Sequence, residues 1–317
     1  MKIFVAGATG ALGRPLVAQL VRRGHEVVGM TRSESKQDLL RDLGARPVVA
    51  DALDPDGVAR AVAEAEPGVI VHQLTAIGEI GAFNPRRLER DFAATNRLRT
   101  EGTDHLLAAG RAVGIKRFVA QSFEPWVFER TGGPVKSEDD PVDTAPPAQA
   151  RTTLEAIKYL EKAVTGADWT EGIALRYGGF YGPGTSIGLH PLGELVEMVR
   201  GRKFPLAGKG TGVWSFIHIE DAAAATVEAI EHGTRGVYNV VDDEPAPISE
   251  WLPELAKAVG AKPPRRVPLW LARLAGGELA TVMMTELRGA SNTKAKRELG
   301  WQPRYPSWRE GFAKGLG

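Results

Sequence analysis

Short apolar runs and amphipathic segments alternate along the first two thirds of the chain. The segments between the runs carry apolar residues at helical spacing, as in 55–65 and 88–112. This alternation predicts right-handed βαβ units on a parallel sheet whose two faces are both covered by helices, which is an α/β fold. The predicted strands of this part are residues 2–6, 25–30, 47–50, 68–72 and 116–121.

The alternation continues toward the C-terminal end, but a long irregular segment interrupts it. Residues 123–150 are rich in Pro, Gly and acidic side chains, which predicts a long loop. Trp126 and Phe128 favour a lid that is mobile without ligand and ordered with it, whereas docking on the core is the alternative. Further helices are predicted near 150–166, 220–231, 250–259 and 268–275, and further strands before Arg176 and at 237–241.

Three glycines at a spacing of three residues follow the first predicted strand and open a helix. Gly7 lets the chain turn sharply, Gly10 removes a side chain where backbone must approach a pyrophosphate, and Gly13 allows close helix packing. The helix N-terminus offers unpaired N–H groups and the positive end of its dipole to an anion. An ordinary glycine-rich turn is the alternative. The predicted cofactor-binding residues of this turn are Gly7, Thr9, Gly10, Ala11, Leu12 and Gly13.

Arg32 follows the second predicted strand, at the point where a dinucleotide domain selects its cofactor. An acidic residue there would bind the ribose 2′-hydroxyl of NAD, whereas an arginine can hold the 2′-phosphate of NADP. One charge-assisted contact contributes roughly 1.5–3 kcal/mol, enough for a preference of about ten- to a hundredfold. Arg32 therefore predicts NADP, and a solvated surface arginine is the alternative.

Further cofactor contacts are expected after the third and fourth predicted strands. Asp51 follows the third strand, next to Ala52, and is placed to contact the adenine edge of the cofactor. The alternative is that Asp51 or Asp54 caps the next helix. The segment that leaves the fourth strand includes small residues that allow close approach to a cofactor. Its predicted contacts are Leu74, Thr75 and Ala76.

Composition narrows the classes of function. The 317 residues carry a formal net charge of +1, so no global attraction to nucleic acid or an anionic membrane is expected. The absence of cysteine excludes disulfides and thiolate nucleophiles and is compatible with a cytoplasmic protein. The six histidines lack helical ligand spacing, so no metal site is expected. A strand that starts at residue 2 leaves no room for a signal peptide, and no apolar stretch is long enough for a membrane span.

Six short motifs occur in one order along nearly the whole chain. They are Gly7-x-x-Gly10-x-x-Gly13, Asp51, Asn96 in Thr95-Asn96-x5-Gly102-Thr103, Ser122, Leu175-Arg176-x4-Tyr181-Gly182-Pro183-Gly184 and Phe216-Ile217-His218-Ile219-Glu220-Asp221. Together they resemble the extended short-chain dehydrogenase/reductase family, the NAD(P)-dependent epimerase/dehydratase group.

The resemblance implies a Rossmann-type doubly wound parallel sheet with a smaller substrate-binding part near the C-terminus. In relatives the helices near 88–112 and 150–166 pair two subunits, so a homodimer is also implied. The implied Rossmann domain comprises residues 1–181 and 213–241, and the implied substrate-binding part comprises residues 182–212 and 242–317.

The chain departs from the family at Tyr-x-x-x-Lys. In the family the tyrosine exchanges a proton, while the lysine holds the ribose and lowers the tyrosine pKa. Here the motif positions fall either on Thr153 and Ile157 or on Leu154 and Lys158, and neither register supplies a tyrosine. Tyr159 is rotated well away from Leu154 on a helix of 3.6 residues per turn. The chain is therefore expected to be an atypical member of the family.

Other side chains are candidates for the chemistry. Tyr177 comes where the sixth strand ends, at the mouth of the expected cofactor crevice, and the alternative is a packing tyrosine with a satisfied hydroxyl. Ser122 is placed to donate to a developing alkoxide, and Glu124 is a base if desolvated. The candidate catalytic residues are Ser122, Tyr177, Lys158 and Glu124, with Asn96 and Tyr177 also expected at the cofactor. The candidate substrate-binding residues are Trp126, Tyr181, His190 and Trp214.

The sequence thus predicts a cytoplasmic NADP-dependent oxidoreductase that acts on a carbonyl or carbinol of a small or medium organic molecule. A non-redox isomerase, cyclase or dehydratase on the same scaffold is one alternative, and a dinucleotide-sensing regulatory protein is another. The missing tyrosine favours the alternatives. The nearly complete cofactor motif and the aromatic residues of the 123–150 loop favour catalysis.

Overall fold

A seven-stranded parallel sheet forms the centre of the protein. The computed structural model describes residues 1–79, 84–189 and 193–317. The strand order is β12-β7-β5-β4-β1-β2-β3, so the chain winds outward in both directions from β1 and β4. This order confirms the predicted doubly wound α/β fold. The strands are β1 (Lys2–Ala6), β2 (Glu26–Thr31), β3 (Arg46–Val49), β4 (Val69–His72), β5 (Arg117–Phe123), β7 (Glu171–Tyr177) and β12 (Gly236–Val240).

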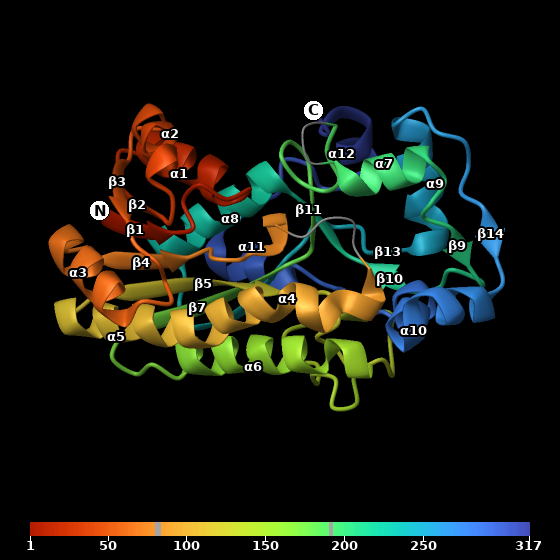
Figure 1. Ribbon diagram of the computed structural model, residues 1–317, viewed down its shortest axis with the longest axis horizontal. Coiled ribbons are helices and arrows are strands. Elements are labelled where there is room, and N and C mark those ends of the chain that lie inside the picture. The colour runs from red at the N-terminus through yellow and green to blue at the C-terminus, as the bar shows by residue number, and fades with distance from the viewer. Residues whose placement is uncertain (80–83, 190–192) are drawn as a thin grey trace.

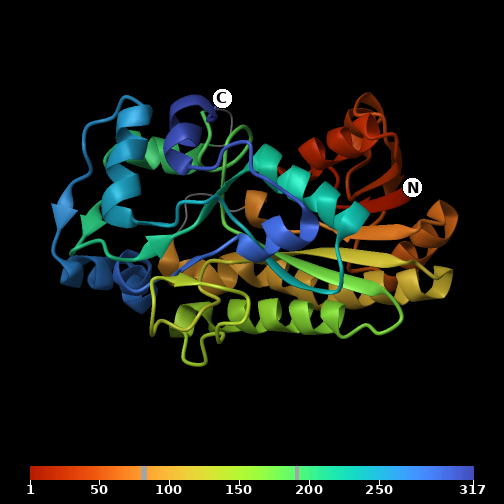
Figure 2. The same ribbon diagram turned by 180° about the vertical axis from the view of Figure 1, so that it is seen from behind.

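Helices cover both faces of this sheet, as Figures 1 and 2 show. Side chains alternate along β1, so Ile3 and Val5 join the core under α1 and α8, while Phe4 and Ala6 join the core under α3, α5 and α6. Both faces of the sheet are therefore shielded from water, which explains why the strands consist almost entirely of apolar residues. The helices of this part are α1 (Gly13–Arg22), α2 (Gln37–Asp42), α3 (Pro55–Ala65), α4 (Leu88–Arg97), α5 (Thr103–Val113), α6 (Arg151–Thr165), α8 (Ile219–His232) and α11 (Thr293–Leu299).

A second core lies at the other end of the molecule, to the right in Figure 1. Its centre is aromatic, because Phe216 contacts Trp251 and Phe312 edge-on at centroid distances of 5.2 and 5.5 Å. Its helices are α7 (Glu194–Arg200), α9 (Ile248–Ala258), α10 (Leu269–Thr285) and α12 (Trp308–Lys314). The short strands outside the main sheet are β6 (Val135–Lys136), β8 (Gly179–Tyr181), β9 (Leu206–Ala207), β10 (Val213–Trp214), β11 (Phe216–His218), β13 (Ala246–Pro247), β14 (Arg266–Val267) and β15 (Gly289–Ala290).

Two elements differ from the sequence-based prediction. The helix expected over 88–112 is interrupted by η4, a π-helical turn at Leu98–Gly102 that joins α4 to α5. Such turns rotate the side chains that follow, and they are frequent at functional sites. The helix expected over 268–275 extends to Thr285 and is kinked at Gly277, whose φ of 74° is not helical. Among the described residues, no helix is both long and apolar enough to cross a membrane.

Candidate functional site

The glycine turn between β1 and α1 leaves no room for side chains. Gly7 has a φ of +90°, and a Cβ there would stand 2.7 Å from the Gln73 carbonyl oxygen. A Cβ on Gly13 would meet the carbonyl groups of Gly7 and Ala8, so this glycine seats the helix on the turn itself. No side chain caps the start of α1, and its first turn holds no acidic residue. The turn therefore suits a pyrophosphate, which the α1 dipole attracts.

The residues predicted to hold the adenosine end follow β2 and β3, the two strands next to β1 on one side of the sheet. Arg32 is exposed directly after β2, whose last residue, Thr31, pairs with Val49 of β3. Asp51 is also exposed, and its Oδ1 accepts the N–H of Leu53 at 3.0 Å. This hydrogen bond closes a local turn, so Asp51 does not cap the helix that follows. Asp54 takes the N-cap position of α3 without a side-chain bond, and Ala52 is buried, its carbonyl accepting from His105 Nδ1 at 2.8 Å.

The segment that leaves β4 is fixed by hydrogen bonds to its backbone. The Leu74 N–H donates to His72 Nδ1 at 3.2 Å, and the Ala76 N–H donates to Thr95 Oγ1 at 3.0 Å. Thr75, between them, is partly exposed. The glycine turn lies against this segment, because the Cβ position of Gly7 is 3.1 Å from Leu74 N. The structure thus brings together two predicted cofactor-binding segments, the glycine turn and the segment after β4.

Of the four side chains in the two possible registers, helix α6 buries Thr153, Leu154 and Ile157 and leaves Lys158 partly exposed. Thr153 and Ile157 are fully buried, and Asn96 donates from Nδ2 to Thr153 Oγ1 at 3.2 Å. Lys158 lies on the outer surface, where it pairs with Glu155 at 3.0 Å and lines a groove between α4 and α6. The prediction of Lys158 as a catalytic residue is therefore wrong, because its side chain points to solvent. Asn96 faces α6, and its Oδ1 has no hydrogen-bond partner among the described residues.

Ser122 belongs to a buried ionic cluster. Its Oγ donates to Glu161 Oε1 at 2.6 Å, and Arg176 binds both oxygens of that carboxylate at 2.7 Å. All three side chains are buried. Arg176 supplies two of the three donors to this carboxylate and the serine hydroxyl is the third, so this hydroxyl is directed to Glu161 and not to an alkoxide.

Tyr177 is a packing residue, which corrects the expectation of a replacement acid. Its side chain is 1% exposed in the core beneath α8, and its hydroxyl lies 2.6 Å from Thr226 Oγ1. Because Thr226 donates to the Ala222 carbonyl, the tyrosine donates to Thr226. Burial raises the pKa of Tyr177 well above its usual range, which disfavours proton exchange. The structure therefore fits the alternative, a packing tyrosine whose hydroxyl is satisfied, here by the Thr226 side chain.

The predicted substrate-binding residues separate into two groups. Tyr181 is fully buried between His218 and Phe312, so its prediction as a substrate contact is wrong. His190 lies outside the described residues. Trp214 and Trp126 are half-buried, and the Trp214 indole donates to the Met283 carbonyl at 2.9 Å. These two tryptophans remain available to a ligand.

The 123–150 loop is docked in the structure. Phe128 is 4% exposed beneath Arg176, and β6 within the loop pairs in parallel with β15. Trp126 contacts Phe92 and Phe123 at centroid distances of 6.1 and 5.3 Å, and its φ of 73° is unusual for a side chain of this size. Docking therefore accounts for Phe128, while Trp126 is held in a strained backbone beside α4.

Glu124 is an isolated acid at the end of β5. Its carboxyl group is 1% exposed and accepts a hydrogen bond from Ser215 Oγ at 3.3 Å. Burial raises its pKa to about 8, although the Ser215 hydrogen bond and the Arg176 charge act in the opposite direction. The group is therefore desolvated, which is the condition under which it was predicted to act as a base, and it is mostly protonated at neutral pH.

We expect Glu124→Gln to change how stability depends on pH. The unfolded chain loses the Glu124 proton near pH 4.5, while the folded protein keeps it to about pH 8. Between these values the wild-type protein should therefore lose up to about 1.4 kcal/mol per pH unit relative to the variant. Urea unfolding from pH 5 to pH 8 measures this difference, with the exposed Glu155→Gln as the control. Parallel curves for wild type and Glu124→Gln would show that the carboxyl group is ionised in the fold.

Sequence reasoning missed Arg99. It lies in the π-helical turn η4, is 2% exposed, and its guanidinium carbon is 5.8 Å from the centroid of the Phe123 ring. Neither Nη atom has a hydrogen-bond partner among the described residues. Burial lowers its pKa to about 10, so the group remains charged at neutral pH. The only signal in the sequence is a cation seven residues after Phe92, on the helix face that packs inward.

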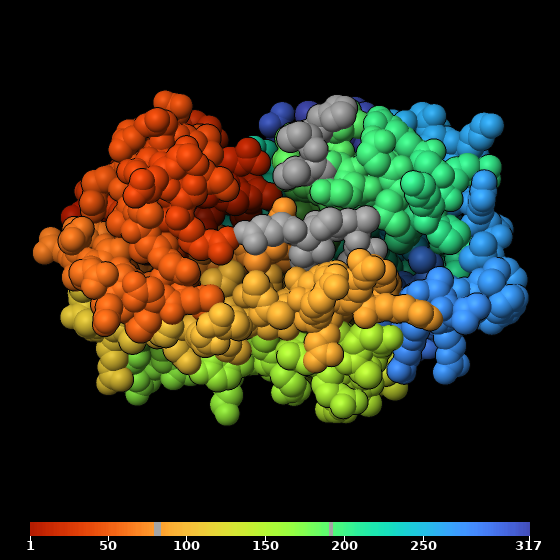
Figure 3. All heavy atoms as spheres, in the orientation of Figure 1, coloured from red at the N-terminus to blue at the C-terminus, as the bar shows by residue number. Residues whose placement is uncertain are grey.

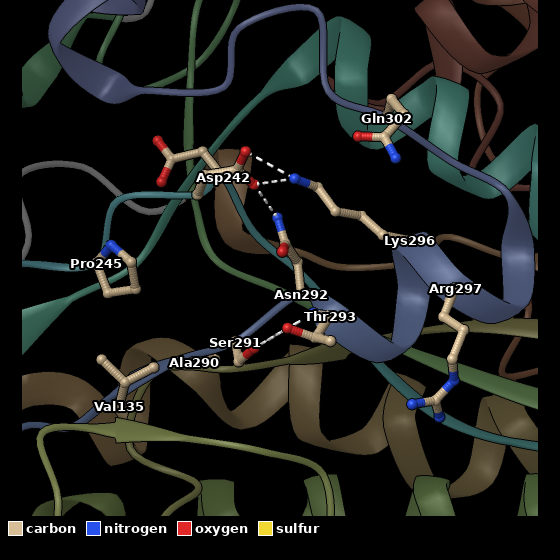
Figure 4. Close-up of a pocket in the computed structure, with 11 residues that line it drawn as sticks. Val135, Asp242, Pro245, Ala290, Ser291, Asn292, Thr293, Lys296, Arg297 and Gln302 are labelled. Atoms are coloured by element: carbon tan, nitrogen blue, oxygen red, sulfur yellow. Dashed lines mark hydrogen bonds and ion pairs between the residues drawn. The ribbon is translucent and has the colours of Figure 1, made fainter.

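Of two pockets on the described surface, one lies at α11 and the other is lined by Asn96 and Lys158. The first, of about 560 Å³, is shown in Figure 4, where the nitrogen atoms of Lys296 and Asn292 point toward the same carboxylate between α11 and the segment after β12. Its charges are paired, because Asp243 accepts from both Lys296 and Asn292 at 2.7 Å. The other, of about 730 Å³, is the groove beside Lys158. On the face shown in Figure 3, the surface is hollowed between the glycine-turn end and the α7 end of the molecule, above α4.

A glycine turn on the central strand of a doubly wound sheet, beside buried polar groups at the ends of β4 and β5, defines a dinucleotide-dependent enzyme of the Rossmann type. The chain belongs to the NAD-dependent epimerase/dehydratase family, whose model matches residues 3–241. This membership confirms the resemblance seen in the sequence, and the family is NAD(P)-dependent.

Relatives with assigned activities include reductases. A 3-diazoavenalumate denitrifying reductase from a Streptomyces species is 45% identical over 321 residues, which cover 99% of this chain and 100% of that protein. A 2-alkyl-3-oxoalkanoate reductase from Stenotrophomonas maltophilia is 30% identical over 270 residues, 82% of this chain and 76% of that protein. The crystal structure of UDP-glucose 4-epimerase from Thermotoga maritima with UDP-glucose has a TM-score of 0.78 at 19% identity and covers 100% of this chain and 97% of its own, which shows the shared fold.

Proposed function

We propose that this chain is an NADPH-dependent reductase whose substrate is a diazo compound of the kind named for its 45%-identical relative. The observation that carries the proposal is the contrast between two parts of one site. The glycine turn for the cofactor is intact, whereas neither register of α6 on the family's Tyr-x-x-x-Lys motif, Thr153 with Ile157 or Leu154 with Lys158, supplies a tyrosine.

The chemistry of a diazo acceptor explains this contrast. When bound, the reduced nicotinamide supplies a hydride. If the accepting carbon carries the group in its cationic diazonium form, a C–H bond forms and the C–N bond breaks, and dinitrogen leaves with that electron pair. No oxyanion develops, so the step needs neither a general acid nor an oxyanion donor. A carbonyl acceptor, as expected from the sequence, would need one.

The role of this chain's residues would be to bind the cofactor and to orient the substrate. The glycine turn and the start of α1 would hold the pyrophosphate, and Arg32 would hold the 2′-phosphate. The segment Leu74 to Ala76, fixed by His72 and Thr95, would lie along the nicotinamide half. We assign substrate binding to residues 182–212 and 242–317 together with Trp126, and we propose a cytoplasmic homodimer that pairs through α4 and α6.

The direct test combines two substrates with one absorbance measurement. Protein, NADPH and 3-diazoavenalumate should show loss of absorbance at 340 nm in a one-to-one ratio with diazo consumption and nitrogen release. A 2-alkyl-3-oxoalkanoate, the substrate class named for the 30%-identical relative, serves as the carbonyl comparison. Substrate turnover without loss at 340 nm would instead establish a non-redox enzyme.

We expect Arg32→Ala to weaken NADPH binding by roughly 1.5–3 kcal/mol and to leave NADH binding nearly unchanged, because only NADPH carries the 2′-phosphate. Fluorescence titration with each cofactor measures both affinities. Arg41→Ala, which removes an exposed arginine paired with Asp38 on α2, is the matched control and should change neither affinity. Equal affinity of the unmodified protein for NADPH and NADH would refute the assignment of NADP.

A further inference from the structure

Arg99 carries a charge that no described residue balances. The guanidinium is buried, its Nη1 and Nη2 atoms have no partner among the described residues, and the group is charged at neutral pH. Removing a cation from water costs several kcal/mol unless an anion or acceptor compensates for it. A fold retains such a charge where a ligand supplies the missing partner.

The neighbouring groups are already committed. Glu161 contributes an attractive charge to Arg99, but its two oxygens are bound by Arg176 and Ser122. Burial, the largest cause, lowers the pKa of His72 to about 4, and the Arg99 charge acts in the same direction. His72 is therefore neutral, with Nε2 donating to the Leu98 carbonyl at 3.2 Å. The site has a positive charge, a neutral imidazole and a neutralised carboxylate, so it is complementary to an anion.

Aromatic side chains lead from this charge toward the surface. The ring of Phe123 lies next to the guanidinium, Trp126 packs edge-on against Phe123, and Phe92 lies beyond Trp126. Trp126 is half-buried and is held by a left-handed backbone conformation. Trp126 is separated from the buried charge only by Phe123, so the two rings together offer an aromatic surface to a ligand that reaches Arg99.

We propose that Arg99 binds the carboxylate of an aromatic acid whose ring lies against Phe123 and Trp126. This inference rests on the proposed function and specifies its substrate class. The planar guanidinium offers two parallel N–H donors, which match the two oxygens of a carboxylate. Arg99 would thereby position the substrate at the carboxyl ends of β4 and β5, where the nicotinamide half of the cofactor is expected.

A cofactor phosphate is the other source of an anion. The structure favours the substrate, because the phosphate-binding glycine turn follows β1, whereas Arg99 lies in the helical layer beside His72 and Phe123, at the ends of β4 and β5. The nicotinamide half carries no anion beyond the pyrophosphate. The experiment therefore measures substrate and cofactor binding separately.

The test compares an acid with its neutral amide on three proteins. The probes are 4-hydroxycinnamate and 4-hydroxycinnamamide, titrated by tryptophan fluorescence into protein saturated with NADP⁺. The wild-type protein should bind the acid at least about tenfold more tightly than the amide, as expected for a charge-assisted bidentate pair. Arg99→Met should abolish this preference and leave amide and NADP⁺ affinities within about threefold. Arg99→Lys should retain part of the preference.

A stability measurement separates ligand binding from a structural role. Without ligand, Arg99→Met should melt at the same temperature as wild type or higher, because an unpaired buried charge is replaced by an apolar side chain. A lower melting temperature, an undiminished acid preference in Arg99→Met, or equal affinity of wild type for acid and amide would each overturn the proposal. Loss of NADP⁺ affinity with unchanged acid binding would assign Arg99 to the cofactor instead. Acid-selective binding without NADPH oxidation would keep the role of Arg99 and refute the reductase assignment.

Discussion

Gly13→Ala is expected to raise the dissociation constant for NADPH at least about a hundredfold, equivalent to roughly 2.8 kcal/mol. An added Cβ would collide with the Gly7 carbonyl oxygen and would lie 2.7 Å from the Ala8 carbonyl carbon. Both obstacles are backbone of the same turn, so α1 must move away from the strand to accommodate the methyl group. The helix N-terminus would then no longer face the pyrophosphate.

Two further variants separate cofactor binding from folding. A Cβ on Gly10 meets only the Gly7 carbonyl oxygen at 3.3 Å, so Gly10→Ala should fold normally and yet weaken NADPH binding about tenfold by occupying the approach of the pyrophosphate. Gly24→Ala adds a methyl group in open space at a φ of +79° and should cost about 1 kcal/mol of stability without changing affinity. Fluorescence titration and thermal unfolding measure these effects. Normal NADPH affinity in both Gly13→Ala and Gly10→Ala would mean that the turn does not hold the cofactor.

Arg176→Met is expected to destabilise the protein by about 3–5 kcal/mol, because it leaves the Glu161 carboxylate buried without its main partner. Both Arg176 and Glu161 are less than a tenth exposed, and two bonds of 2.7 Å join them. The pair holds α6 against β7, so its loss acts on the helix that borders the site. Urea unfolding at pH 7 gives the free-energy difference.

The double variant Arg176→Met/Glu161→Met provides the control. Removing both charges eliminates the unpaired carboxylate, so the double variant should be more stable than Arg176→Met alone. Arg99→Met is the matched comparison, because both arginines are buried and, within the part of the chain that the structure describes, only Arg176 has a carboxylate bonded to it. A loss below about 1 kcal/mol for Arg176→Met would show that water reaches Glu161 when its partner is removed.

The sequence alone determined the sheet and the cofactor turn. Apolar runs with strand length, separated by helical periodicity, predicted each of β1, β2, β3, β4 and β5 to within about two residues. The sequence also predicted the roles of Gly7 and Gly13, because only glycine fits a turn that has no space for a Cβ atom. These features are local, so nearby residues suffice to specify them.

Only the tertiary structure decided which candidate side chains in the catalytic half of the site are buried or paired. Tyr177 and Tyr181 have the residue type of a proton donor, but Thr226 and Phe312, far away in the sequence, bury them. Conversely, Arg99 resembles any helix-surface cation until η4 rotates it inward and Phe123 covers it. Burial and pairing are set by contacts between distant segments, and the pKa of Glu124 and the spare hydrogen-bonding capacity of Arg99 follow from them. The sequence therefore specified where the cofactor is expected, and only the packed structure decided which side chains are left to meet a substrate.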